Sequence, residues 1–378
     1  MKIALLGDLH VQEKRLDEQL PVLRSIVEEI AQARVDCTVI AGDLTGWAVP
    51  HCATIAERNA LVGFVCDLAD RAPVTVIRGN HDSHGDFDFL SRLRTIHPVR
   101  WYGAPGFHAE NDGPAYGLVA LPWIDRSQIG KDEDWEDGIL RLWKAQIAKC
   151  VAHAPKRLIV VAHVALKGSI LVEGQPPVPT HDPTFRVDDL LPDLDVPMVL
   201  LAGHYHVPQS VGSRAVYPGS PFVNVFGEGE NRGWCLVDLP DRDAPVFVWH
   251  AIPQPARVSI DYLATTDEIA GVKPEMDVWT DTPPAGSHVR IVASFHEQDA
   301  EAALANVRKY ETDLAKAGCL VEVRCEIQRA KRSREGAEAV AGDSPLEERI
   351  RAYAGTCDDP PSPQVLEQAV ALVRDWNA

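Results

Sequence analysis

The chain has 378 residues, of which 46% are hydrophobic and 24% are charged. This length and composition exclude a disordered chain, a collagen-like repeat and a small protein held together by disulfides, and they predict two or three domains. The formal net charge of −18 excludes a protein that coats nucleic acid without sequence preference, because such proteins are basic overall. Any contact with a polyanion is therefore local, or depends on a metal ion or a partner.

The eight cysteines form no C-x-x-C pair and are scattered over the chain, which indicates free thiols in a reducing compartment. The first residues form one short apolar run that ends at a carboxylate, so we expect neither a signal peptide nor a membrane span there. No apolar run elsewhere reaches the roughly 18 residues that a membrane helix needs. We therefore expect a cytoplasmic protein that has no membrane partner.

The first part of the chain alternates short apolar runs with amphipathic stretches. The stretch 16–34 has helical spacing, with Leu16, Leu20 and Leu23 on one face. Alternation of strands and helices is typical of a layered α/β domain. We predict strands at 2–7, 37–41, 74–78, 116–121, 158–162 and 196–202, and helices at 16–34, 55–71 and 135–153.

Beyond these elements the pattern changes twice. Residues 168–184 are rich in Gly and Pro and predict a long surface loop, whereas residues 209–252 predict several short strands without a helix. We therefore expect an α/β fold with α+β layers, in which a β-sandwich is flanked by helices. Pro253 and Pro255 mark the predicted end of this domain, which we assign to 1–254.

The remainder predicts a small α+β domain at 255–328 and a tail at 329–378. The small domain contains a strand, a helix and a strand, in this order: 288–294, 299–317 and 320–327. The tail begins with a polar linker that carries Lys331, Arg332 and Arg334. It ends with two short helical patterns: 345–354 and 363–376.

Polar side chains follow five of the apolar runs at the point where each run ends. Because ligands bind at the carboxyl ends of the strands in open α/β sheets, we expect these side chains to meet at one edge. Asp8 and His10 are two residues apart, as are His204 and His206, so an extended backbone directs both members of each pair to the same side. The predicted site residues, in chain order, are Asp8, His10, Asp43, Asn80, His81, His163, His204 and His206.

Carboxylates, imidazoles and one amide make up this set, without a thiolate, which favours Mn, Fe or Zn over a structural cysteine-type zinc site. The seven residues other than His81 are too many ligands for one ion and fit two ions that share a bridge. Asp43 is the natural bridge, because a carboxylate has two oxygens to share. Two divalent ions carry four positive charges, and the carboxylates of Asp8 and Asp43 neutralise two of them. The site therefore stays positively charged and can bind a phosphate.

Two metal ions about 3.5–4 Å apart are the usual arrangement for in-line displacement at phosphorus. The sequence therefore predicts an enzyme that hydrolyses phosphoesters. His81 follows the ligand Asn80 and is not needed as a ligand itself. We expect it to donate a proton to the leaving oxygen.

The ordered motifs D-x-H, GD, GNHD, H and GHxH resemble those of the calcineurin-like metallophosphoesterase superfamily, over the predicted first domain. The resemblance implies one metal site formed by Asp8, His10, Asp43 and His206. It implies a second metal site formed by Asp43, Asn80, His163 and His204. It also implies that His81 is the catalytic histidine.

A narrower resemblance is to the SbcD-type nuclease subunit of bacterial DNA double-strand-break repair. It rests on Tyr-Pro-Gly-Ser-Pro at 217–221, Phe-Gly-Glu at 226–228, Leu-Pro-Trp at 121–123 and Phe-Arg-Val at 185–187. It implies an exonuclease or endonuclease with two divalent metal ions. Mn is the expected metal, and Mg, Fe and Zn are the alternatives. It also implies a homodimer, DNA contact by a capping domain at 255–328, and terminal helices that bind the coiled coil of an SbcC-like SMC-family ATPase.

Several residues near these motifs have ordinary alternatives. Asp82 either orients a ligand or is a turn residue, and His84 is either a second orienting residue or a surface histidine. Arg78 and Arg126 either touch phosphate or make ion pairs elsewhere. The basic linker either contacts DNA or is solvated, and the apolar face of the last helix, at 366–373, either binds a partner or packs within its own domain.

Three functions are compatible with these features. The first is a metal-dependent DNA nuclease that acts with an ATPase in an SbcCD-like complex of DNA repair and recombination. The alternative is a small-substrate phosphodiesterase or phosphatase that acts on nucleotides or phosphoproteins, which would not need a tail for a partner. A scaffold that kept the fold but lost catalysis is disfavoured, because the ligand set is complete.

Overall fold

The computed structural model describes residues 1–46, 52–109, 116–170, 182–224, 226, 231–263, 283–328, 345–355 and 361–376. The chain divides into two compact units, which we describe separately. The first unit contains Met1–Ile260, Asp277–Ile291 and Tyr310–Val323. The second contains Asp261–Met276, Val292–Lys309 and Arg324–Ala378.

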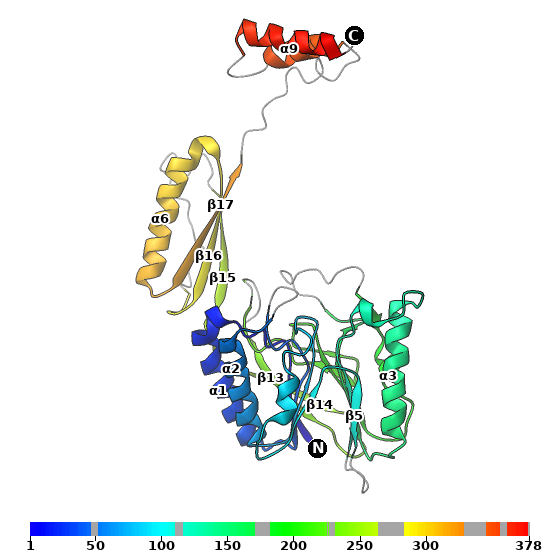
Figure 1. Ribbon diagram of the computed structural model, residues 1–378. Coiled ribbons are helices and arrows are strands. Elements are labelled where there is room, and N and C mark those ends of the chain that lie inside the picture. The colour runs from blue at the N-terminus through cyan, green and yellow to red at the C-terminus, as the bar shows by residue number, and fades with distance from the viewer. Residues whose placement is uncertain are drawn as a thin grey trace. The chain divides into compact units, whose positions relative to one another are not determined.

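A six-stranded sheet in the order β14-β13-β1-β2-β3-β4 forms one half of the first unit (Figure 1). Four of its strands run parallel: β1 (Lys2–Leu6), β2 (Cys37–Ile40), β3 (Val74–Ile77) and β4 (Val99–Tyr102). The sheet is completed by β13 (Gly233–Asp238), which is antiparallel to β1, and by β14 (Val246–Ala251), which is antiparallel to β13.

A second six-stranded sheet has the order β11-β12-β10-β7-β6-β5. Its parallel strands are β6 (Gly117–Leu121), β7 (Leu158–His163), β10 (Met198–Gly203) and β12 (Ala215–Tyr217). Its antiparallel edge strands are β5 (Gly106–Ala109) and β11 (Gln209–Val211). A separate two-stranded sheet pairs β8 (Ala165–Leu166) with β9 (Thr184–Phe185).

The two large sheets pack face to face, and helices cover their outer faces (Figure 1). β1 is apolar throughout because both of its faces are buried. Ile3 and Leu5 pack toward the second sheet, whereas Ala4 and Leu6 belong to the core under the helices. The first sheet is covered by α1 (Leu16–Ala33) and α2 (Ile55–Ala69), and the second by α3 (Trp135–Val151). This layered sandwich confirms the predicted fold class.

The ends of the outer helices follow from local chemistry. α2 begins with a capping box, in which Glu57 N donates to Thr54 Oγ1 at 3.2 Å and Thr54 N donates to Glu57 Oε2 at 2.9 Å. The N-cap residue of α3 is Asp134, whose side chain accepts from Asp137 N. The C-cap residue of α1 is Arg34, which has a left-handed backbone (φ 51°).

The predicted elements of the sandwich occur with ends that differ by at most two residues. The strands β4, β5, β8 and β9 were not predicted, and β11, β12, β13 and β14 were predicted only together, as several short strands at 209–252. Most of the predicted loop at 168–184 lies outside the described residues, and its last residue, Thr184, belongs to β9.

A three-stranded sheet in the order β15-β16-β17 follows the sandwich in sequence. Its elements are β15 (Arg257–Leu263), β16 (His288–His296), α6 (Ala300–Lys316) and β17 (Leu320–Gln328). β16 buries alternate side chains from Val289 to Phe295. The strands and the helix predicted for this part are confirmed, whereas β15 was not predicted. The domain boundaries at 254 and 328 stay predictions.

Two helices end the described chain: α8 (Leu346–Gly355) and α9 (Pro363–Trp376). They lie side by side (Figure 1), and Arg351 pairs with Glu367 at 2.6 Å. The predicted linker at 329–343, with its basic cluster, lies outside the described residues. Within the described part of the chain, every helix is too short or too polar to cross a membrane.

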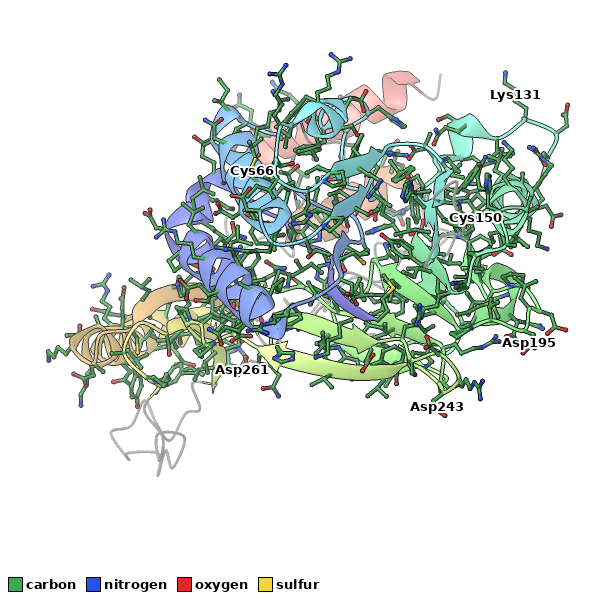
Figure 2. All side chains as sticks on the ribbon, turned by 90° about the horizontal axis from the view of Figure 1, so that it is seen from below. Cys66, Lys131, Cys150, Asp195, Asp243 and Asp261 are labelled. Carbon is green, nitrogen blue, oxygen red and sulfur yellow. The ribbon has the colours of Figure 1, made fainter. Side chains whose placement is uncertain are left out.

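The cysteines provide a test of the packing. Burial raises the pKa of Cys37 and of Cys235 to about 12 and that of Cys150, on the inner side of α3, to about 11 (Figure 2). Cys52 and Cys325 are exposed. Charged side chains such as Lys131, Asp195 and Asp243 project outward at the periphery (Figure 2).

We therefore expect an alkylating reagent at neutral pH to label Cys52 and Cys325 in the native protein within minutes. Cys37, Cys150 and Cys235 should be labelled only after denaturation, because the thiolate is the reactive form and burial disfavours it. Peptide mapping by mass spectrometry measures each site separately. Rapid labelling of Cys37 or Cys235 in the native protein would contradict the packing between the two sheets.

Candidate metal centre

The candidate site lies where the carboxyl ends of the parallel strands of both sheets meet. The strand ends supply Asp8 and His10 after β1, Asp43 after β2, Asn80 and His81 after β3, His163 at the end of β7, and His204 and His206 after β10. Hydrogen bonds join the two sheets there: His163 Nδ1 donates to Ala41 O at 2.7 Å, and His204 N donates to Asp8 Oδ1 at 2.9 Å. The structure thus brings together the eight residues predicted for the site.

The backbone at the site is strained. Among the described residues other than glycine, six have positive φ, and four of them are predicted ligands: Asp8 (52°), His10 (43°), Asp43 (54°) and His204 (106°). Positive φ is unfavourable for side chains with a Cβ atom and costs on the order of 1–3 kcal/mol at each residue. The surrounding fold must hold these residues in place, which is typical of functional sites.

Two glycines allow the ligand loops to approach one another. A Cβ atom on Gly79 would lie 2.0 Å from Asp43 Oδ1 and 2.4 Å from Asp43 N. A Cβ atom on Gly42 would lie 2.5 Å from His163 Nδ1 and 2.9 Å from Gly79 Cα. Only glycine leaves room for this contact between the loops after β2 and β3.

In the first group of ligand atoms, two imidazoles and a carboxylate converge. His10 Nδ1 donates to Gly46 O at 2.5 Å, so the neutral ring carries its lone pair on Nε2. That nitrogen lies 3.1 Å from His206 Nε2 and 3.6 Å from Asp43 Oδ2. Two ligands about 2.1 Å from one ion and at right angles to each other are about 3 Å apart, so the two imidazoles fit one cation.

The second group has the same design. His163 Nδ1 donates to Ala41 O, which leaves the lone pair of the neutral ring on Nε2. This nitrogen lies 2.8 Å from Asn80 Oδ1 and 3.4 Å from Asp43 Oδ2. Asn80 Oδ1 also lies 3.1 Å from His204 Nδ1. Asp43 Oδ2 thus faces both His10 and His163, as a bridging ligand would.

Two buried atoms test whether this set fits metal ions. Asp8 Oδ2 and His204 Nε2 are buried and have no hydrogen-bond partner in the described structure. Such atoms are costly unless an ion or a water satisfies them. The ligand atoms of Asp8, His10 and His206 lie within 4.8 Å of one another, as do those of Asp8, Asp43 and His163. Asp8 belongs to both of these sets of three residues. The residues therefore fit a centre for two metal ions.

The electrostatics of the site favour a cation. Burial would raise the pKa of Asp43, but the charges of His163 and His81 hold it well below its usual range. Burial lowers the pKa of His10 to about 3, and burial together with the charge of His163 lowers that of His204 to about 3. Both imidazoles are therefore neutral, as a metal ligand must be. His163 differs: burial would lower its pKa, but the charge and hydrogen bond of Asp43, the charge of Asp8 and the bond to Ala41 O together raise it to about 9.

Asp82 ties two ligand loops together. Its carboxylate accepts from Gly79 N and Leu44 N, both at 2.8 Å, and from Thr45 N at 3.3 Å. Burial and the charge of Asp43 raise its pKa to about 7 in spite of these bonds. Asp82 therefore connects the loop that carries Asp43 with the loop that carries Asn80.

His81 lies against the first group of ligands. Its backbone N donates to Asp43 Oδ1 at 2.9 Å, and its ring meets that of His10 edge-on, with centroids 5.0 Å apart. His81 Nδ1 is buried and has no hydrogen-bond partner in the described structure. The side chain is thus held beside the ligands, where a proton-transfer group would act.

The other residues considered from the sequence lie outside the ligand groups. His84 Nε2 donates to Asp125 Oδ2 at 2.8 Å, and Arg78 donates to the same oxygen at 3.2 Å. Arg126 donates to the carbonyl oxygens of Gly130 and Glu133. The two arginines thus make internal contacts.

Trp123 covers the second group and was not predicted as a site residue. Its ring is stacked on that of His204, with centroids 5.4 Å apart and an interplanar angle of 25°, and it meets His163 edge-on at 6.3 Å. Arg78 fixes the Trp123 backbone by donating to its carbonyl oxygen at 2.5 Å. Trp123 follows Pro122 directly after the end of the strand β6. The ligands were predicted because they follow the ends of strands, and the same argument could have found Trp123.

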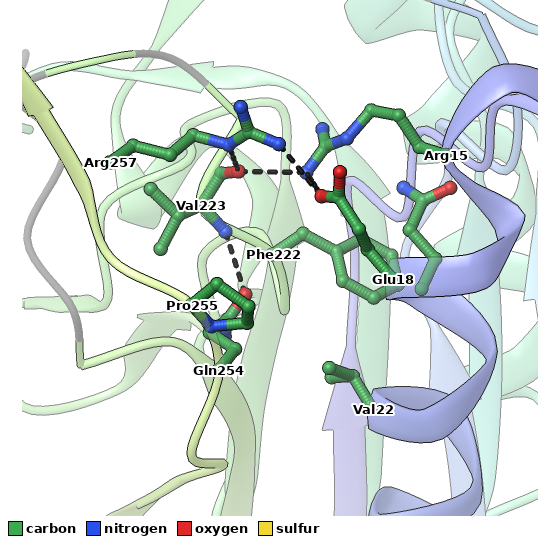
Figure 3. A pocket seen from close by; sticks show the side chains of 9 residues that line it. Arg15, Glu18, Val22, Phe222, Val223, Gln254, Pro255 and Arg257 are labelled. Atoms are coloured by element: carbon green, nitrogen blue, oxygen red, sulfur yellow. Dashed lines mark hydrogen bonds and ion pairs between the residues drawn. The ribbon is translucent and has the colours of Figure 1, made fainter. Parts of the chain in front are cut away.

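The first turn of α1 supports the His10 loop. Gln19 is fully buried, donates to His10 O at 3.1 Å and accepts from Gln12 N at 2.9 Å. The adjacent Glu18 pairs with Arg257 at 2.8 Å and with Arg15 at 3.5 Å around a small cavity (Figure 3). α1 therefore holds one ligand loop directly, and its own start is held by ion pairs.

Comparison with known proteins agrees with this geometry. The calcineurin-like phosphoesterase family matches residues 1–208, and the chain therefore belongs to that family. With the two ligand groups described above, the protein is a metal-dependent phosphoesterase and so a hydrolase. No curated protein matches the chain.

Two solved structures show weaker similarity. The anchor protein GAP50 of the inner membrane complex of Plasmodium is 15% identical, with a TM-score of 0.46 over 66% of this chain and 84% of that chain. A dimetal phosphatase from Danio rerio is 12% identical, with a TM-score of 0.39 over 66% of this chain and 99% of that chain. At these values, neither similarity contributes to the assignment.

Gly79→Ala should disrupt the centre, because the new Cβ atom would collide with the Asp43 backbone and carboxylate. We expect Mn²⁺ affinity to fall by at least about tenfold and the free energy of unfolding by about 1–3 kcal/mol. Gly63→Ala is the matched control: Gly63 is exposed in α2 with nothing near its Cβ position, and this change should stabilise by about 1 kcal/mol. Metal titration and chemical denaturation measure both effects, and wild-type Mn²⁺ affinity in Gly79→Ala would contradict the described contact.

Trp123→Leu should reduce Mn²⁺ affinity by about 10–100-fold, because residues that orient a ligand typically have effects of this size. Trp123→Phe should retain most of the affinity, since a flat ring still packs against His204. Electron paramagnetic resonance of free Mn²⁺ measures binding without an activity assay. Equal affinity in Trp123→Leu and the wild type would show that the stack does not orient the ligand.

Proposed function

We propose that the protein is a Mn-dependent DNA nuclease, the nuclease subunit of an SbcCD-like repair complex in the cytoplasm. The observation that carries the proposal is the double group of oxygen and nitrogen ligands around Asp43 Oδ2, which contains no thiolate. Such a set suits Mn²⁺. The segment 217–221, which resembles SbcD-type subunits, supports DNA as the substrate. The part of the chain that follows the family match also supports DNA as the substrate, because it contains an additional sheet and two terminal helices.

The chemistry follows from the positions of the side chains. When bound, two divalent ions would neutralise charge on the scissile phosphate and activate the attacking water. Asp43 would help to hold both ions, because its Oδ2 lies near both His10 Nε2 and His163 Nε2. His81 would donate a proton to the leaving oxygen. Its backbone bond to Asp43 would keep it at a fixed place relative to the bridge.

We assign the contact with the ATPase to α8 and α9. Leu346, Tyr353 and Val365 expose apolar side chains on these helices. Val370 lies on the apolar helix face at 366–373 that was considered for partner binding from the sequence. It is buried within the chain itself, so only part of that face is available. Exposed apolar residues on paired helices suit an SbcC-like coiled coil. DNA contact by the domain at 255–328 and a homodimer complete the proposal.

The purified chain should degrade linear duplex DNA with Mn²⁺, and chelation by EDTA should abolish the activity. His81→Ala should lower the rate by about 10²–10⁴-fold, because it removes a general acid. His97→Ala is the control, since His97 precedes β4 at the opposite end of the strands. Gel assays of labelled DNA measure the rates.

Absence of DNA cleavage would contradict the nuclease proposal for the chain on its own. If a small chromogenic phosphodiester were still hydrolysed, the metal centre would be functional, and the substrate would be small or the ATPase would be required. Equal rates for His81→Ala and the wild type would refute the role of His81.

A further inference from the structure

His84 and Asp125 form an exposed pair that the hydrolysis described above does not use. The side chain of His84 is 59% exposed, and its Nε2 donates to Asp125 Oδ2 at 2.8 Å. Because Nε2 makes this bond, Nδ1 is the ring nitrogen that remains for a contact with solvent or substrate. Asp125 is 36% exposed and belongs to neither ligand group.

The carboxylate of Asp125 is held in place by groups beneath it. Arg78, whose side chain is 2% exposed, donates to Asp125 Oδ2 at 3.2 Å. Asp125 is also the N-cap of the 3-10 helix η3 (Arg126–Gln128), and its backbone N donates to Gln128 Oε1 at 2.8 Å. A carboxylate fixed in this way holds the imidazole of His84 in one orientation, as a preorganised binding group requires.

Both members of the pair lie on segments that also form the metal centre. His84 is three residues beyond His81, so their Cα atoms are at most about 11 Å apart. Asp125 is two residues beyond Trp123, whose ring is stacked on the ligand His204. Contacts also connect the pair with the centre, because Arg78 donates both to Asp125 and to the carbonyl oxygen of Trp123. We call this position, outside the ligands themselves, the rim of the site.

The charges of the group suit an anion. Asp125 is shared by the guanidinium of Arg78 and the imidazole of His84, so one negative charge faces two groups that can carry positive charge. When His84 is protonated, the three side chains have a net positive charge and present an N–H donor outward. A phosphate is the anion that a phosphodiester chain would place at this rim.

We infer that His84 binds a phosphate next to the scissile one in an extended phosphodiester substrate, and that Asp125 is its positioning residue. This inference rests on the proposed nuclease function, because a small phosphodiester has no second phosphate to reach the rim. His84 thereby favours polymeric over small substrates.

The test compares a labelled single-stranded oligonucleotide with bis(4-nitrophenyl) phosphate, each with Mn²⁺. In His84→Gln, KM for the oligonucleotide should rise about tenfold, as expected for the loss of one charge-assisted hydrogen bond. The ratio of kcat/KM for the oligonucleotide to kcat/KM for the small diester should fall by about the same factor. The dependence of log KM on log salt concentration should become shallower by about one.

Three further variants separate binding from structure. His84→Lys keeps a cation and should restore part of the oligonucleotide affinity, whereas Asp125→Asn should weaken the affinity in the same direction as His84→Gln. His153→Gln is the matched control, because this exposed histidine follows α3 and precedes β7, at the opposite end of the strands. Thermal melting and Mn²⁺ content should be equal to wild type in the two His84 variants and in His153→Gln. Asp125→Asn should keep its Mn²⁺ content but melt at a lower temperature, because the buried Arg78 loses its charge partner.

The outcomes distinguish the two proposals. If the wild type cleaves the small diester but neither single-stranded nor duplex DNA, the nuclease proposal fails for the chain on its own, and the inference about His84, which concerns this chain alone, fails with it. If the wild type cleaves DNA and His84→Gln has the same KM and salt dependence, only the inference about His84 is overturned. Equal losses on both substrates would also overturn it, because they would show a general structural role.

Discussion

The convergence of electron-rich ligand atoms in a buried place is the constraint on which the rest of the structure depends. The Nε2 atoms of His10 and His163 lie 3.6 and 3.4 Å from the same carboxylate oxygen of Asp43. Four ligand residues also have positive φ. Local preferences oppose this arrangement, so it has to be imposed by the packed sheets, whose strands carry large apolar cores on both faces.

Three supporting contacts reach the site from different elements. Asp82 joins two ligand loops, Gln19 of α1 fixes the backbone of His10, and Trp123 beyond β6 covers His204. Each of them acts on a backbone segment or on a ring plane, and none needs to touch the substrate. These contacts therefore support the ligand geometry from within the fold.

Much of the fold could be predicted because β1, β2, β3, β7 and β10 are buried on both faces and appear as continuous apolar runs. β4 and β5 are four residues long and only partly buried, so they lack this signal. The candidate ligands could be singled out because each follows such a run. The stack of Trp123 on His204 could not, because it joins elements that are distant in sequence. The bonds of Gln19 are local, but a glutamine has no metal chemistry that would single it out in the sequence.

β1 is the first strand of the chain and lies in the middle of its sheet, between β2 and β13. Lys2 pairs with Asp238, so one edge of β1 has no partner until residue 238 has been synthesised. During translation, β1 therefore stays an apolar strand with an open edge until β13 has been made, and nascent chains aggregate through segments of this kind. Co-translational folding of this sandwich depends on protection of its first strand until the ribosome has made β13, and a chain that stops before β13 leaves that edge permanently open.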